Sequence, residues 1–208
     1  MQAKSYHHSQ LSPAHELILG MVRREARALE IGCATGYMTR RLREDLGCSV
    51  TAVDIDPAQA REAEPHAQRL IVGDIMDAGT WARIDGKFDY VIFADVLEHV
   101  SDPWEVLKRT KAVLDDGGTV LASIPNVAYY KVRKEILLGR FNYTDFGILD
   151  NSHLRFFTAK TARALFECNG YRVERMQATF RGRVDRALGR VARNAFAYQF
   201  IIKASVSH

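Results

Sequence analysis

The sequence has few cysteines and no long apolar run, and each absence excludes a class of protein. Its three cysteines, Cys33, Cys48 and Cys168, are scattered, so they match neither a disulfide framework nor a metal-ligand spacing. No apolar run approaches the roughly 18 residues that a membrane-spanning helix requires, and the first residues contain no apolar signal segment. We therefore expect free thiols and a cytoplasmic location.

The composition indicates a single globular domain. Of the 208 residues, 47% are hydrophobic and 26% are charged, which is enough to bury a core. The net charge of +4 is small, but the segment 181–195 is expected to form a basic amphipathic helix with arginines at Arg181, Arg183, Arg186, Arg190 and Arg193. Such a helix suits an anionic membrane surface or a charged acceptor, and a solvated basic face explains it equally well.

Strand and helix patterns alternate over the first 126 residues. The apolar segments 28–31, 49–53, 69–72, 88–94 and 119–124 predict strands, and the segments 13–24, 37–46, 57–64 and 103–114 predict helices. The run 88–94 is continuously apolar, as in a central strand that is buried on both faces. This alternation predicts an α/β fold with a doubly wound, mostly parallel sheet of the Rossmann-like type.

The pattern changes after Pro125. We expect a helix over 127–138, a loop over 139–152, a helix over 158–169 and two last strands over 171–179 and 197–205. One domain is therefore expected to contain an N-terminal helical segment (1–26), a core (27–126), a lid over an acceptor (127–157) and a C-terminal region (158–208).

A turn of small residues joins the first predicted strand to the next helix. It reads Glu30-Ile31-Gly32-Cys33-Ala34-Thr35-Gly36, and such a turn lets a ligand approach the backbone and the helix N-terminus. Taken alone, this turn is also compatible with a merely tight loop.

Acidic residues follow the next three strands of the core. Asp54, Asp74 and Asp95 each stand where a predicted strand ends, so they are expected to meet at one edge of a parallel sheet. Asp54 and Asp56 could both cap the helix that begins at Pro57, but we expect Asp56 to cap it and Asp54 to face a ligand.

These segments resemble the ordered motifs of class I S-adenosyl-L-methionine (SAM)-dependent methyltransferases. The matching segments are EIGCATG (30–36), VDID (53–56), VGD (72–74), FDYVIFADVLEHVSDP (88–103) and LDDGGTVLASIPN (114–126). The resemblance implies SAM as cofactor and a seven-stranded sheet that includes an antiparallel C-terminal strand.

The resemblance also implies roles for individual residues. Asp54 would hold the ribose, Asp74 would reach the adenine amino group, and Asp95 would flank the sulfonium. The remaining residues of the expected cofactor site are Glu30, Gly32, Cys33, Ala34 and Gly36 around the methionine part, and Ile55 and Ile75 near the adenine. Ala34 stands where the family usually has glycine.

The C-terminal half carries a second resemblance. SIPNVAYYKVRKEILLGRF, DNSHLRFFT and FAYQFIIKAS resemble bacterial methyltransferases that act in cell-surface polysaccharide or sugar modification, and more loosely the methionine-biosynthesis W proteins. This implies a small-molecule or sugar-containing acceptor. A nucleic-acid acceptor is disfavoured, because the Pro-Pro-aromatic signature of base-methylating enzymes is missing after Ala94-Asp95.

The catalytic candidates are His153, as a base, and Asp95. His153 could equally be a structural histidine that bonds to the backbone, and His99 is more readily explained as structural. Asp95, Glu98 and His99 resemble positions at which ubiquinone-biosynthesis O-methyltransferases hold magnesium, but we expect transfer without a metal.

Two alternative functions remain at this stage. Tyr130 and Lys134 have the spacing of the proton-transferring pair in NAD(P)-dependent short-chain reductases, although the glycine pattern of that family is missing. The chain could also be a methyltransferase fold that binds SAM without turnover.

Overall fold

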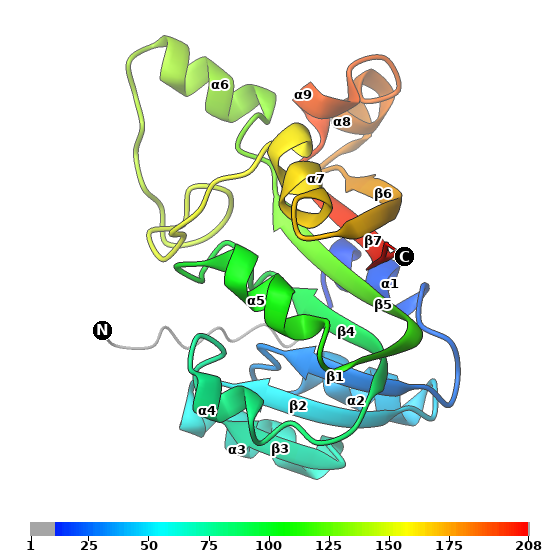
Figure 1. The fold of residues 1–208 in the computed structure, drawn as a ribbon. Helices are drawn as coiled ribbons and strands as arrows, with labels where there is room; N and C mark the ends of the chain where they lie inside the picture. Colours follow the sequence, from blue (N-terminus) through cyan, green and yellow to red (C-terminus); the bar gives the residue numbers. More distant parts are fainter. Residues whose placement is uncertain (1–10, 208) are drawn as a thin grey trace.

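The computed structural model describes residues 11–207, and the sheet at its centre has the order β3-β2-β1-β4-β5-β7-β6 (Figure 1). The strands are β1 (Arg27–Ile31), β2 (Ser49–Asp54), β3 (Arg69–Val72), β4 (Phe88–Ala94), β5 (Leu114–Pro125), β6 (Tyr171–Thr179) and β7 (Gln199–Val206). The first five strands pair in parallel, and β7 lies antiparallel between β5 and β6. The predicted α/β sheet with an antiparallel C-terminal strand is confirmed.

Helices cover both faces of the sheet. They are α1 (Pro13–Leu19), α2 (Tyr37–Glu44), α3 (Pro57–Ala63), the short 3₁₀ turn Glu64–His66, α4 (Ala78–Trp81), α5 (Pro103–Thr110), α6 (Tyr130–Leu137), α7 (Ala159–Glu167), α8 (Arg183–Leu188) and α9 (Arg193–Phe196). Along β4, Val91 and Phe93 pack in the core on the side of α5 and α7, while Ile92 packs on the side of α1 and α2. This confirms that β4 is buried on both faces.

Several helices are shorter than the sequence pattern suggested. The helix expected over 13–24 ends at Leu19, before Gly20, and the helix expected over 103–114 ends at Thr110 because Leu114 already belongs to β5. The single basic helix expected over 181–195 is wrong: α8 ends at Leu188, and α9 begins separately at Arg193. Two of the five arginines are used within the fold, since Arg193 donates to the Met176 carbonyl and Arg181 lies 4.9 Å from the Tyr198 ring centroid.

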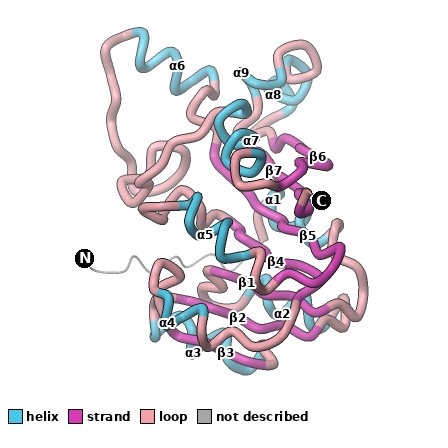
Figure 2. The backbone as a smooth tube through the Cα atoms, viewed as in Figure 1, coloured by secondary structure: helices cyan, strands magenta, loops and turns pink. Residues whose placement is uncertain are grey.

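The segment after β5 leaves the sheet and returns to it. The Asn126 side chain anchors its start by donating to the carbonyls of Asn194 and Ala197 at 2.9 and 2.8 Å, and the Tyr129 hydroxyl donates to Asp185 at 2.5 Å. Helix α6 then projects from the body, and a long loop runs back from it towards α5 (Figure 2). Within residues 11–207, the helices are all too short or too polar to cross a membrane.

Candidate functional site

The turn between β1 and α2 requires small residues. Gly32, Ala34 and Gly36 have φ values of +73°, +48° and +79°, a conformation that side chains disfavour. A Cβ atom on Gly32 would lie 2.6 Å from a methyl carbon of Val96. The backbone N–H of Gly32 donates to the Val53 carbonyl at 2.8 Å, which ties the turn to the end of β2.

The Asp54 carboxylate joins the same two elements. Its Oδ2 accepts from the Ala34 N–H at 2.7 Å and its Oδ1 from the Asp56 N–H at 2.9 Å. Burial raises the pKa of Asp54, and these two N–H donors oppose that rise. Asp56 itself accepts from the Ala58 N–H at 2.8 Å and caps α3, as predicted. Ile55, between these two aspartates, is 63% exposed, so its side chain is available to cover a flat ring.

Glu30 lies beneath the turn and is 1% exposed. Its carboxyl oxygen accepts from the Thr39 hydroxyl at 2.6 Å, a partner on α2 that the sequence pattern did not suggest. Burial raises the pKa of Glu30 to about 8, so the carboxyl is protonated in the folded chain at neutral pH.

We expect Glu30→Gln to stabilise the protein increasingly as the pH rises from 4.5 to about 8, and most above that range. The folded state keeps a proton on Glu30 between its ordinary pKa of 4.5 and about 8, which the unfolded chain releases, so stability falls as pH rises through this window. Glutamine does not ionise, so the variant should not lose stability in this pH window. At pH ~8.5 the variant should exceed the parent in free energy of unfolding by a few kcal/mol, because one pKa unit corresponds to about 1.4 kcal/mol.

Urea denaturation of both proteins at pH ~5 and ~8.5 measures the effect. Glu44, which is exposed on helix α2, supplies the control, because Glu44→Gln removes a surface carboxylate in place of a buried one. A Glu30→Gln difference that does not grow with pH would contradict a buried, protonated Glu30.

The other residues expected near the cofactor lie at the same edge of the sheet. Asp74 is exposed and its Oδ1 accepts from the Met76 N–H at 2.7 Å. Ile75 and Cys33 are buried, Ile75 in the main core and Cys33 against Ala52. Burial raises the pKa of the Cys33 thiol, so it is protonated and unreactive. The cofactor contacts of these three residues remain predictions.

Asp95 directly follows β4 with a φ of +58°, and the polar groups around it come from segments distant in the sequence. Its Oδ1 accepts from the Ser123 hydroxyl at 2.7 Å and from the Gln199 amide on β7. The imidazole Nε2 of His15, on α1, lies 3.9 Å from Asp95 Oδ2. These contacts fix Asp95 at the carboxyl edge of the sheet.

A second cluster of polar side chains, Glu98, His99 and His153, lies near the segment that follows Asp95. Glu98 is 1% exposed, and one ligand atom from each of Glu98, His99 and His153 lies within 4.8 Å of the others. The rings of His99 and His153 are 4.7 Å apart. Burial raises the pKa of Glu98 well above its ordinary value, and burial together with the charge of His153 lowers the pKa of His99. Sequence patterns alone could not predict that His153 lies beside Glu98.

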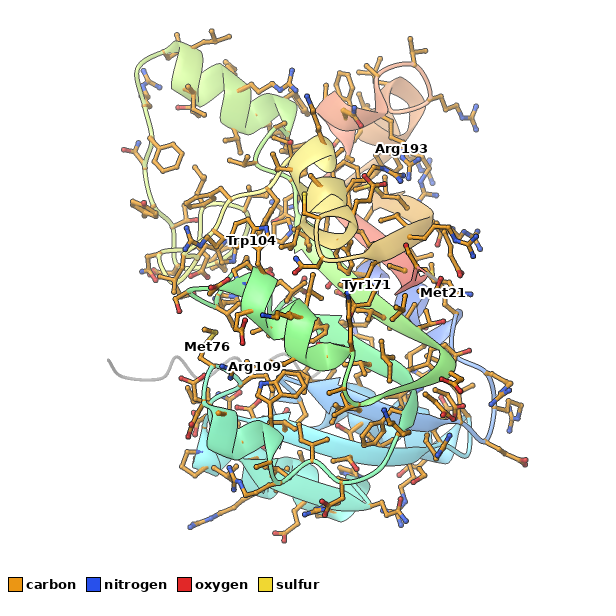
Figure 3. The ribbon with its side chains drawn as sticks, viewed as in Figure 1. Met21, Met76, Trp104, Arg109, Tyr171 and Arg193 are labelled. Carbon is orange, nitrogen blue, oxygen red and sulfur yellow. The ribbon has the colours of Figure 1, made fainter. Side chains whose placement is uncertain are left out.

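Backbone hydrogen bonds hold the loop of His153 against the end of β4. The N–H groups of Leu154 and Arg155 both donate to the Glu98 carbonyl, at 2.8 and 3.0 Å. The Arg155 guanidinium lies 5.7 Å from the ring centroid of Trp104, which Figure 3 labels at the start of α5. The returning loop is thus docked against the segment that follows β4.

Comparison with known proteins identifies the family. Residues 4–175 match the family model described as a methyltransferase domain. This chain belongs to the class I SAM-dependent methyltransferases. The observed strand order, glycine turn and acidic strand ends are the features on which the sequence resemblance rested.

Individual relatives agree with this assignment. A ubiquinone biosynthesis O-methyltransferase of Xanthomonas campestris pv. campestris (strain B100) is 32% identical over 107 residues, which are 49% of this chain and 44% of that protein. The chain therefore spans less than half the length of the curated relatives that it matches. A SAM-dependent methyltransferase structure from Methanosarcina mazei superposes with a TM-score of 0.65 at 20% identity, covering 95% of this chain and 99% of that one.

A second similar structure contains a bound cofactor product. It is the magnesium protoporphyrin IX methyltransferase of Synechocystis PCC 6803 with bound SAH, at a TM-score of 0.64 and 18% identity, covering 93% of this chain and 82% of that one. SAM fits the residues present here, because Gly32, Ala34 and Gly36 give the turn no large side chain and Asp54 presents a carboxylate beside it. The spacing of Tyr130 and Lys134 had suggested a reductase, but both residues lie on the projecting helix α6.

Proposed function

We propose that this methyltransferase transfers the methyl group of SAM to an oxygen of a small or sugar-containing, anionic acceptor. The observation that carries the proposal is the pair of imidazoles, His99 and His153, at the carboxyl end of β4. A hydroxyl is a poor nucleophile until its proton is removed or its charge is stabilised, and imidazoles are suited to that task near neutral pH. An amine acceptor depends less on proton removal or charge stabilisation by the protein.

Aromatic side chains continue from His153 into the loop. The ring of Phe156 lies 6.2 Å from that of His153 and 5.7 Å from that of Phe141. Phe141 in turn contacts Tyr143 edge-on at 5.5 Å, and both are exposed, at 44% and 58%. Exposed aromatic faces stack on rings and sugars, so this cluster is a suitable acceptor platform.

The segment that precedes this platform in the sequence is rich in positive charge. The α6 segment carries four cations, namely Lys131, Arg133, Lys134 and Arg140. They can bind a phosphate or carboxylate on the acceptor. The 32% identity to an O-methyltransferase also supports oxygen as the methylated atom.

A product assay tests the proposal. The purified protein is incubated with SAM and a panel of phenols, sugars and nucleotide-sugars, with amines of matched shape as competitors, and the S-adenosylhomocysteine released is measured. Mass spectrometry then locates the added methyl group. We expect O-methylated products. Methylation of nitrogen alone would contradict the proposal, and SAM binding without any product would favour a binding protein without turnover.

We expect His153→Ala to lower turnover about 10²-fold while SAM affinity changes little, because His153 lies on the acceptor side of the site. Steady-state kinetics and isothermal titration calorimetry with SAM measure the two quantities. His66→Ala, in the 3₁₀ turn that follows α3, is the control and should leave both unchanged. Unaltered turnover in the folded His153→Ala variant would make His153 structural.

A further inference from the structure

The carboxyl group of Glu98 is the least satisfied polar group in the described part of the chain. Its side chain is 1% exposed, and neither carboxyl oxygen has a hydrogen-bond partner. A buried polar group without a partner costs free energy, and a buried charge costs more. Such a group in a folded protein calls for an explanation, and a bound cation supplies one.

A backbone carbonyl oxygen lies beside the Nδ1 atom of each of the two neighbouring imidazoles. The Nδ1 atom of His153 lies 3.0 Å from the Ile148 carbonyl oxygen, and that of His99 lies 3.3 Å from the Ser152 carbonyl oxygen. A carbonyl only accepts, so in each contact Nδ1–H is the donor, and the lone pair of the neutral ring is on Nε2. Metal-binding histidines are fixed in this way by hydrogen bonds to carbonyls or carboxylates.

The spacing of the cluster suits a small ion. Metal bonds of about 2.0–2.2 Å place ligand atoms roughly 3–4 Å apart. The three candidate atoms already lie within 4.8 Å of one another, so small side-chain rotations would bring them to the spacing of ligands around one ion. The backbone bonds from Leu154 and Arg155 to the Glu98 carbonyl hold the two contributing segments together.

We propose that Glu98, His99 and His153 bind one divalent first-row transition-metal ion, such as Zn²⁺, Mn²⁺ or Fe²⁺. Two imidazoles and one carboxylate favour these ions over Mg²⁺ and Ca²⁺, which prefer oxygen ligands. Asp95 is outside this cluster of closely spaced ligand atoms, and its Oδ1 accepts from Ser123 and Gln199. This set and its preferred metal therefore differ from those considered from the sequence, where transfer without a metal was expected.

Three protein ligands leave coordination positions for an acceptor oxygen. His153 would then act on the acceptor through the ion instead of accepting its proton directly. This part of the inference rests on the proposed function, whereas metal binding itself does not depend on it.

The test uses Co²⁺ as a visible probe of the full-length protein. After removal of metals with EDTA and dialysis, Co²⁺ is titrated at pH ~7.5 and its d–d absorption is followed. We expect one Co²⁺ per chain and a rise in melting temperature of about 5 °C, with no comparable rise for Mg²⁺ at the same concentration. Zn²⁺ should displace Co²⁺ and abolish the absorption.

Variants assign the ligands. His153→Ala and Glu98→Gln should each weaken Co²⁺ binding about 100-fold, with SAM affinity as the check that they are folded. His66→Ala should bind Co²⁺ like the parent, as should the double variant His7→Ala/His8→Ala, which removes a histidine pair outside the described residues. Absence of Co²⁺ binding at about 100 µM, or one-to-one binding that His153→Ala leaves unchanged, would overturn the proposal.

The metal and the reaction can fail separately. Turnover that survives complete metal removal would refute a role for the ion in transfer and return His153 to the role of base. A metal-binding protein that methylates only nitrogen would refute the proposed acceptor and leave the metal site in place.

Discussion

Replacing Gly36 by alanine is expected to lower the melting temperature by roughly 10 °C and the affinity for SAM about 10³-fold. Gly36 precedes α2 with a φ of +79°, and an added Cβ would lie 2.6 Å from the Cα and 2.8 Å from the Cβ of Ala63 on α3. Strain in this conformation costs about 1–2 kcal/mol and overpacking about 1–3 kcal/mol or more. In a chain of this size, each kcal/mol lowers the melting temperature by roughly 2–4 °C.

The loss of affinity follows from the direction of the clash. Because the opposing atoms belong to backbone and to a buried Cβ, relief requires α2 to move away from α3, and the turn that faces the cofactor moves with it. Even a shift of ~1 Å in such a site is costly. Thermal unfolding and calorimetric titration with SAM measure the two effects.

Gly117 offers a matched control on the same chain. Its φ of +78° is nearly identical, but nothing lies within 4 Å of a Cβ added there. Gly117→Ala should therefore show only the conformational cost, a few degrees of melting temperature, with normal SAM affinity. Equal behaviour of the two variants would show that the contact with Ala63 does not position the cofactor turn.

The cofactor half of the site could be predicted because its signals are local. Small residues at a strand-to-helix turn and an acidic residue at the next strand end are each visible within a few residues of sequence. Parallel pairing of β1 with β2 then brings Gly32 and Asp54 together without further information. The same logic separated Asp56, which caps α3, from Asp54, which faces the turn.

The acceptor half could not be predicted to the same depth because its contacts join distant segments. Asp95 bonds to Gln199, 104 positions away, only because β7 inserts between β5 and β6. His153 reaches Glu98 because the loop after α6 folds back onto the end of β4. No periodicity or spacing in one sequence encodes such pairings, which depend on the packing of the whole domain.

The prediction of a single helix over 181–195 was wrong for a different reason. Its arginines repeat at helical spacing, which favoured one amphipathic helix. Gly189 directly follows α8, and a Cβ at Gly189 would lie 2.2 Å from a ring carbon of Phe180. Close packing of the chain against that ring thus outweighs the helical charge pattern.

Asp54→Ala is expected to weaken SAM binding about 10²–10³-fold. Direct hydrogen bonds from the ribose hydroxyls to a carboxylate are worth about 1.5–3 kcal/mol, or roughly 10–100-fold in affinity. The variant should lose further SAM affinity, because the same carboxylate accepts hydrogen bonds from the Ala34 N–H at 2.7 Å and the Asp56 N–H at 2.9 Å. Ala34, at a φ of +48°, is left without the bond that stabilises its strained conformation.

Asn at this position should not restore binding, although it keeps the shape of the side chain. Both Asp54 oxygens accept from backbone N–H groups, so either orientation of an amide would place its NH₂ group against a donor. We expect Asp54→Asn to lose at least tenfold in SAM affinity, whereas Asp56→Ala should lose only a helix cap, worth about 1 kcal/mol, and keep SAM affinity. Calorimetric titration with SAM, S-adenosylhomocysteine and NADP measures all three variants, and NADP should bind to none. If Asp56→Ala lost SAM affinity and Asp54→Ala kept it, the ribose contact would belong to Asp56, the residue that caps α3.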